Sequence, residues 1–189
     1  MKKCLIYIYL LLLTSLCCLQ AGAVSSEIRS LSVSDGLPDL VINTIYKDSK
    51  GYVWMGTNTS VERFDGIRLE HYMVEGSNEN LKRVFALVEM PGNELWVGTG
   101  MGLFRLADDA EKLERLAPEM ITSGVHAFCK LGDVLYVGTE KGLYVYKGGV
   151  FEHVLVDKNI FSRANFVTGM VEGENGILWL STMGGLKSL

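Results

Sequence analysis

The sequence has little proline, only 3 residues among 189, whereas glycine occurs 21 times. It also lacks an excess of positive charge, since 18 basic residues stand against 22 acidic ones and the net charge is −4. This balance argues against non-specific nucleic-acid binding, which depends on basic side chains that displace counterions from phosphates. The 10% of aromatic residues excludes a disordered tail. The length suits one sizeable domain, and the glycines indicate a chain that turns often.

The motifs of common catalytic and metal centres are absent. The sequence contains no GxSxG nucleophile motif, no phosphate-binding loop and no HExxH zinc motif. Its three histidines, His71, His126 and His153, form no Cys/His/Asp cluster with the spacing of metal ligands. We therefore expect no catalytic residue, no metal and no cofactor in this chain, and we interpret the histidines as structural.

Residues 1–23 are typical of a secretory signal peptide. Lys2 and Lys3 precede an uncharged apolar run over residues 4–19, and Ala21 and Ala23 are the small residues that a signal peptidase requires. The apolar run is shorter than the roughly 20 residues of a membrane-spanning helix. We predict cleavage after Ala23, export through the Sec pathway, and a periplasmic or other extracytoplasmic location.

Removal of this leader changes the composition of the chain. Three of the four cysteines leave with it, and Cys129 alone cannot form a disulfide within the chain. The mature chain keeps 16 basic against 22 acidic residues, a net charge of −6. We expect Cys129 to be a small core residue. Contact with a membrane is expected only through the signal peptide or through a C-terminal span outside this sequence.

One motif recurs four times in the mature chain, which indicates a repeat architecture. Each copy has an aromatic residue, a small residue two positions later and then a threonine, and the aromatic residues are 42, 40 and 43 positions apart. We expect the aromatic residue to fill the space between neighbouring sheets, the small residue to make room for it, and the threonine to bond the turn backbone. The predicted anchors are Trp54, Gly56, Trp96, Gly98, Tyr136, Gly138 and Trp179.

Short hydrophobic runs divided by turn residues fill each copy. They are rich in Val, Ile, Phe, Tyr and Trp, which is typical of strands, and glycine-containing turns between them indicate tight hairpins. Four consecutive antiparallel strands in about 40 residues predict an all-β fold, a β-propeller of four-stranded antiparallel blades. The predicted strands are residues 41–48, 52–57, 61–64, 68–74, 84–90, 94–99, 103–106, 112–116, 125–131, 134–139, 143–147 and 151–156.

The repeats define the expected domain organisation. The signal peptide is followed by a predicted strand at residues 24–33 and by the propeller at residues 34–189. The fourth copy stops after its third strand, so the N-terminal strand closes a ring of four blades or the chain is the front of a larger ring. We favour the larger, incomplete ring, because four-bladed rings are rare. The copies cover about residues 41–74, 84–116, 125–156 and 166–189.

Residues 42–57 carry a resemblance to a known family. They fit the pattern Val/Ile-x-x-Ile-x-x-Asp-x-x-Gly-x-x-Trp-x-Gly-Thr, and Arg-Phe-Asp-Gly follows at residues 63–66. This resembles the propeller repeat of two-component regulators, and the resemblance covers residues 27–189. The third copy departs from the pattern, since it lacks the aspartate and has Tyr136 in place of tryptophan. The first copy lacks the Gly-Leu pair of the others.

The resemblance implies a sensor. In that family the repeats build large extracytoplasmic propellers, usually followed by a β-sandwich, a transmembrane helix and a cytoplasmic histidine kinase. It implies that this chain is the N-terminal periplasmic part of a hybrid two-component protein, which detects an oligosaccharide and signals to a kinase outside the chain. It also implies a homodimer formed through the full-length ectodomain. An exported propeller enzyme, a lyase or glycosidase, and a non-catalytic interaction scaffold are the open alternatives.

The loops that enter the inner strands form the functional face of a propeller, together with the loops that join second and third strands. In this sequence they carry amides, arginines and an exposed aromatic residue, which suit the hydroxyls and rings of a sugar. The alternative is that these polar loops are simply solvated. The predicted ligand-binding residues are Asp39, Asn80, Arg83, Arg163 and Asn165.

Overall fold

The computed structural model describes residues 30–74 and 81–189. The chain divides into Met1–Ser30 and Leu31–Leu189, and the described residues of the second unit form one compact body. The predicted signal peptide, and most of the strand predicted at residues 24–33, lie outside the described residues. The described end of that strand is different, because Val33–Asp35 forms a short 3-10 helix, η2. No helix in the described ranges has the length and apolar character needed to cross a membrane.

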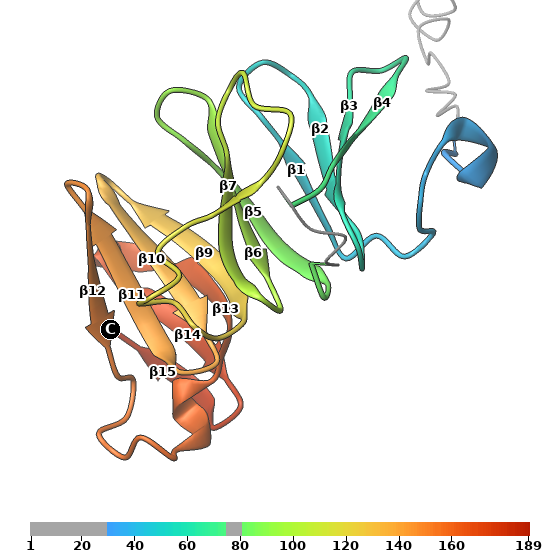
Figure 1. Cartoon of the computed structure of the whole chain (residues 1–189). Coiled ribbons are helices and arrows are strands. Elements are labelled where there is room, and N and C mark those ends of the chain that lie inside the picture. The colour runs from blue at the N-terminus through green and yellow to red at the C-terminus, as the bar shows by residue number, and fades with distance from the viewer. Residues whose placement is uncertain (1–29, 75–80) are drawn as a thin grey trace, which may run out of the picture. The chain divides into compact units, whose positions relative to one another are not determined.

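Four antiparallel sheets follow one another along the second unit, and in each of them the strands pair in chain order (Figure 1). Blade 1 contains β1 (Thr44–Lys47), β2 (Val53–Gly56), β3 (Val61–Phe64) and β4 (Leu69–Tyr72). Blade 2 contains β5 (Val84–Met90), β6 (Glu94–Thr99), β7 (Gly102–Leu106) and β8 (Glu114–Arg115). Blade 3 contains β9 (Val125–Leu131), β10 (Val134–Thr139), β11 (Gly142–Lys147) and β12 (Val150–Val154). Blade 4 contains β13 (Val167–Glu172), β14 (Leu178–Thr182) and β15 (Gly185–Ser188).

The first strands of the four sheets are neighbours. Strand β1 packs against β5, β5 against β9, and β9 against β13. Antiparallel meanders that meet along their first strands are the blades of a β-propeller. The predicted all-β propeller fold is therefore confirmed, and the larger ring stays a prediction.

The first two strands of blades 2 and 3 agree with the sequence, whereas β1 is shorter than the predicted residues 41–48. Strands β5, β6, β9 and β10 have the predicted bounds. Strand β8 is shorter than predicted because Leu113 leaves its sheet. The Leu113 N–H donates to the Met73 carbonyl at 2.8 Å, and Leu113 forms a parallel bridge with Val74. Blade 2 is thereby joined to the outer edge of blade 1.

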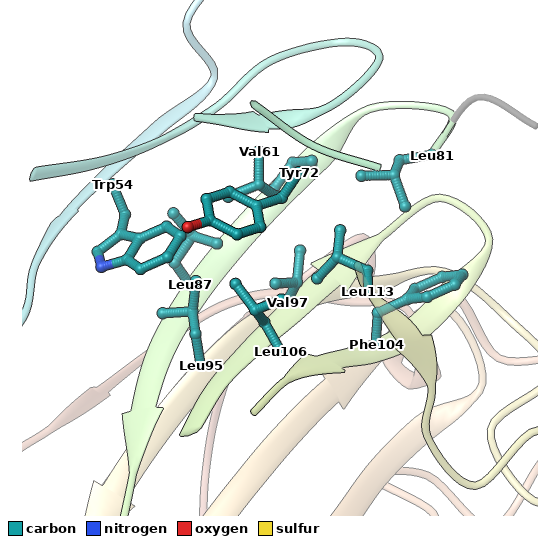
Figure 2. Packing of buried hydrophobic residues seen from close by; sticks show 11 residues of the cluster. Trp54, Val61, Tyr72, Leu81, Leu87, Leu95, Val97, Phe104, Leu106 and Leu113 are labelled. Carbon is teal, nitrogen blue, oxygen red and sulfur yellow. The ribbon is translucent and has the colours of Figure 1, made fainter. Parts of the chain in front are cut away.

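Hydrophobic side chains fill the space between blades. Figure 2 shows the cluster between blades 1 and 2, in which the Trp54 and Tyr72 rings of blade 1 lie beside Leu87 and Leu95 of blade 2. The ring centroids of Trp54 and Tyr72 are 5.3 Å apart. A second cluster surrounds Trp96 between blades 2 and 3, and a third lies between blades 3 and 4. Each blade thus buries its apolar face mainly against the next one.

At each junction a glycine of one blade touches a valine of the next. A Cβ atom at Gly98 would lie 2.8 Å from Val125 Cγ1 and 2.9 Å from the Val125 carbonyl oxygen. The same contact occurs at Gly56 with Val84, and at Gly138 with Val167, where the distances to Cγ1 are 2.5 and 2.8 Å. The small residue of the repeat therefore allows the inner strand of the following blade to approach.

The threonine of each copy closes the turn after the second strand. Its hydroxyl donates to the carbonyl oxygen three residues later, as the sequence predicts. The four bonds are Thr57 to Ser60 at 3.1 Å, Thr99 to Gly102 at 3.0 Å, Thr139 to Gly142 at 2.9 Å and Thr182 to Gly185 at 2.6 Å. The repeat in sequence is thus a repeat of hydrogen bonds as well as of packing.

The aromatic anchors differ in burial along the chain. Trp54 is 5% exposed and Trp96 is 3% exposed, whereas Trp179 in blade 4 is 39% exposed. Tyr136 is half-buried. Val171 and Leu186 of blade 4 are also exposed, since no described blade packs on the far side of this sheet. The sequence predicts the same role for every anchor, whereas the burial of each anchor depends on the blade that packs beside it.

The tyrosine in the first interblade cluster makes stability depend on pH. Burial, and the hydrogen bond from its hydroxyl to Glu70, raise the pKa of Tyr72 from 10.0 to about 12. Because the folded pKa is the higher one, the stabilisation is complete below pH 10.0 and is lost as the pH rises through about 12. We expect the free energy of unfolding in urea to fall less over this pH range in Tyr72→Phe than in the wild type. Equal slopes for the two proteins would refute this assignment.

Candidate functional site

The loops that enter the inner strands lie at the same end of the blades as the turns between second and third strands, because strands of a meander alternate in direction. Backbone hydrogen bonds join them across blades. The Arg83 N–H donates to the Asn58 carbonyl at 2.9 Å, and the Gly100 N–H donates to the Arg83 carbonyl at 3.0 Å. We call this surface the loop face, and it comprises residues 36–43, 57–60, 81–83, 100–101, 117–124, 140–141, 157–166 and 183–184.

Three rings form a row at this end of the blades. Phe85 in β5 and His126 in β9 have ring centroids 4.2 Å apart, and His126 lies 4.9 Å from Phe166, which directly precedes β13. The Arg83 guanidinium lies 5.8 Å from the centre of the Phe85 ring. We call Arg83, Phe85, His126 and Phe166 the ring row. It crosses three blades, and its three rings are half-buried.

A carboxylate stands beside the ring row. Nε2 of His126 lies 3.2 Å from Oε1 of Glu140, in the β10–β11 turn. A Cβ atom at Gly124 would lie 2.8 Å from the same oxygen, so a larger residue there would displace the Glu140 carboxylate. The imidazole side chain is 13% exposed and the carboxylate 41% exposed. An imidazole and a carboxylate at this distance can exchange a proton or bind a hydroxyl group together.

Two predicted residues of blades 1 and 2 converge on one asparagine. Asp39 accepts hydrogen bonds from the Val41 N–H at 2.9 Å and from the Asn58 amide at 2.8 Å. The Val41 N–H and, to a smaller degree, the Asn58 amide lower the pKa of the Asp39 carboxyl group. Arg83 is exposed and has a φ of 75°, held by the backbone bonds to Asn58 and Gly100. Asp39 thus supports the loop, and Arg83 presents its charge to solvent.

The predicted residues near blade 4 have different roles. Asn165 is only 2% exposed, and its amide accepts from the Asp157 N–H at 2.9 Å and donates to the carbonyls of Asp157 and Asn159 at 3.1 and 2.9 Å. It therefore holds the loop before β13, and its assignment as a ligand-binding residue stays a prediction. Arg163 is exposed, with Nη2 3.9 Å from the Met183 sulfur. Asn80 lies outside the described residues.

Five residues of this site were not predicted from the sequence: Asn58, Phe85, His126, Glu140 and Phe166. Asn58 and Glu140 lie in turns between second and third strands, and nothing in their local sequence distinguishes them from solvated turn residues. The repeat register places the His126 strand beside the strand that leads to Glu140, which is the one signal that points to this pair. Within residues 30–74 and 81–189, no group of three or more His, Cys, Asp or Glu residues has a geometry suited to a metal ion.

Residues 36–59 match the family model described as two component regulator propeller. This segment of the chain is therefore similar to one repeat of that family. The matched segment contains the loop that enters β1, the first hairpin and the turn that carries Asn58. None of the curated proteins matches the chain.

Solved structures share the propeller fold of this chain. The extracellular domain of BT3049, described as a hybrid two component system of B. thetaiotaomicron, is 22% identical with a TM-score of 0.71, over 85% of this chain and 25% of that one. That of BT4673, described as a one component system of the same bacterium, is 22% identical with a TM-score of 0.73, over 87% and 23%. Streptogramin B lyase is 15% identical with a TM-score of 0.57, over 81% and 55%. The chain thus spans about a quarter of the two extracellular domains.

Proposed function

We propose that this propeller is the ligand-sensing module of an extracytoplasmic two-component signalling protein. The family match at residues 36–59 and the likeness to extracellular domains of such systems support this proposal. According to this proposal, the signal peptide at residues 1–23 directs export to the periplasm. A histidine kinase in the remainder of a longer protein receives the signal. The signal begins when a ligand binds and changes the packing or the dimer geometry of the ectodomain.

The ring row is the observation that carries the proposed ligand class. Aromatic faces bind the apolar C–H face of a sugar ring, and the guanidinium of Arg83 with the His126–Glu140 pair offers donors and acceptors for hydroxyls. A surface that crosses three blades suits an extended chain of rings better than one small molecule. The proposed ligand is therefore a glycan-derived oligosaccharide bound at the loop face.

One contact also favours a second candidate function, an exported propeller lyase or glycosidase. The His126–Glu140 pair is an acid/base couple of the kind that proton-transfer catalysis uses. A propeller enzyme, Streptogramin B lyase, shares the fold. In this alternative, His126 is the catalytic residue and the ring row binds the substrate.

A binding series on the full chain tests both candidates. We expect Arg83→Gln to weaken oligosaccharide binding roughly tenfold, since it removes the guanidinium that would donate to the hydroxyls of a sugar stacked beside it. Affinity is measured by isothermal titration calorimetry, with a ligand first selected on a glycan array. Arg68→Gln is the matched control, because Arg68 is an exposed arginine in the β3–β4 turn at the other end of the blades.

The outcomes separate the two functions. Wild-type affinity in both Arg83→Gln and Phe85→Leu contradicts an oligosaccharide site at the loop face. Cleavage of the bound oligosaccharide, followed by chromatography and lost in His126→Gln, identifies the enzyme instead. Binding without cleavage supports the sensor.

A further inference from the structure

A cleft lies between blades 2 and 3, at the strand ends opposite to the loop face. Its volume is about 490 Å³, within the range of about 300–1,000 Å³ that small-molecule sites occupy. Turns of the β5–β6, β9–β10 and β11–β12 hairpins form its mouth. The side chains that define its chemistry are Glu94, Trp96, Arg105, Lys130, Tyr146 and Phe151.

The repeat itself provides a comparison, because the matching groove between blades 1 and 2 has a volume of only about 20 Å³. There, Lys50 of the β1–β2 hairpin forms an ion pair with Asp108 of the β7–β8 turn. Asn93 also donates to Asp108 at 3.2 Å. These contacts tie the turns of the two blades together and close the groove.

At the groove between blades 2 and 3, the residues equivalent to Lys50 and Asp108 cannot form an ion pair. Gly92 stands four residues before its tryptophan, as Lys50 does, and the strand register aligns Gly148 with Asp108. Both charged side chains of the closing pair are thus replaced by glycine. The open cleft is a specific departure from the repeat and not a general property of interblade contacts.

Aromatic rings form one wall of the cleft. The centroid distances are 4.8 Å from Trp96 to Tyr146, 4.8 Å from Tyr146 to Phe151 and 5.7 Å from Trp96 to Phe151. Trp96 is buried, whereas Tyr146 and Phe151 are half-buried. In blade 2, Leu106 occupies the register position of Tyr146. This wall can stack on the flat apolar face of a ring.

The polar lining carries both signs of charge equally. Glu94 and Asp133 are acidic, and Arg105 and Lys130 are basic. Oε1 of Glu94 accepts a hydrogen bond from the Trp96 indole at 2.6 Å, and Arg105 pairs with Glu114 at 3.1 Å, so both side chains are held in place. A lining with two charges of each sign favours a neutral ligand with many hydroxyls over an anion or a cation.

We propose that the cleft between blades 2 and 3 binds a neutral mono- or disaccharide. The ring of the sugar stacks on Tyr146 and Phe151, and its hydroxyls meet Glu94, Arg105 and Lys130. Gly132, Gly148 and Gly149 at the mouth have no atom within 4 Å of a Cβ position, which leaves backbone groups open to the ligand. The site is separate from the loop face, and its existence does not depend on the proposed sensor function.

The test measures binding of cellobiose, maltose and lactose to the full chain by ligand-observed NMR and calorimetry. Asp133→Trp places a ring at the mouth from an exposed turn and is expected to abolish binding while the protein stays folded. Phe151→Leu keeps an apolar side chain but removes the stacking ring, and is expected to weaken binding roughly fivefold. Glu152→Trp is the control, because Glu152 is exposed on the same strand, β12, and does not line the cleft.

The results distinguish this site from the loop face. Binding that survives in Arg83→Gln and is lost in Asp133→Trp supports the proposal. Failure of all three neutral sugars to bind overturns it, as does wild-type affinity in Asp133→Trp. Stronger binding of glucuronic acid or phenylalanine than of any neutral sugar overturns the ligand class.

Discussion

Replacing Trp96 with alanine is expected to lower the free energy of unfolding by about 3–5 kcal/mol. The indole is 3% exposed and packs in the cluster between blades 2 and 3, with Tyr146 and Phe151 as ring neighbours. Its removal leaves a cavity that strands fixed on both sides cannot close. Urea denaturation of the full chain, followed by tyrosine fluorescence and circular dichroism, measures the loss.

Trp179→Ala is the matched control, because it changes the same repeat position in blade 4. Trp179 is 39% exposed, so we expect a loss of only about 1 kcal/mol. Equal losses in the two variants would show that the outer face of blade 4 is covered in solution. A larger loss for Trp179 would contradict the packing described for both blades.

Gly98→Ala is expected to lower the free energy of unfolding by about 1–3 kcal/mol through overpacking. In a strand interior this substitution ordinarily stabilises, by roughly 0.5–1 kcal/mol, because glycine is the more flexible residue in the unfolded chain. Here the sign is reversed, since the new Cβ meets Val125 Cγ1 at 2.8 Å and the Val125 carbonyl oxygen at 2.9 Å. Thermal and urea unfolding both report the change.

A double-mutant cycle with Val125→Ala identifies the clash as the cause. Removal of the valine methyl groups relieves one of the two close contacts, so the double variant is expected to lose less stability than the sum of the single variants. Ser181→Ala is the control at the matching position of blade 4, and we expect it to be nearly neutral. Strictly additive losses at residues 98 and 125 would refute the glycine–valine junction.

The fold is predictable from sequence because its determinants are local. Hairpin turns, apolar strands and the Gly-Thr step recur within about 40 residues, and each strand pairs with its neighbour in the chain. The first two strands of blades 2 and 3 have the predicted boundaries, whereas β1 (Thr44–Lys47) is shorter than predicted. Strand β8 is also shorter than predicted, because Leu113 forms its hydrogen bond with Met73 of the previous blade.

The candidate sites are less predictable because their contacts join distant residues. Glu140 reaches His126 only through the pairing of β9 with β10. Asn165 is predicted as a ligand-binding residue, whereas the hydrogen bonds of its amide go to the backbone of its own loop. The cleft between blades 2 and 3 exists because an ion pair that joins Lys50 to Asp108 has no counterpart there. None of these contacts has a signature within one repeat.

The glycine–valine junction also sets the order in which the chain can assemble. Each valine follows its glycine by fewer than 30 residues, always in the next blade. A hairpin within one blade closes a shorter loop than this junction and forms in about 1–10 μs, so each meander is expected to form before the next blade covers it. A partly assembled propeller then exposes the apolar face of its last blade until the following blade packs on it.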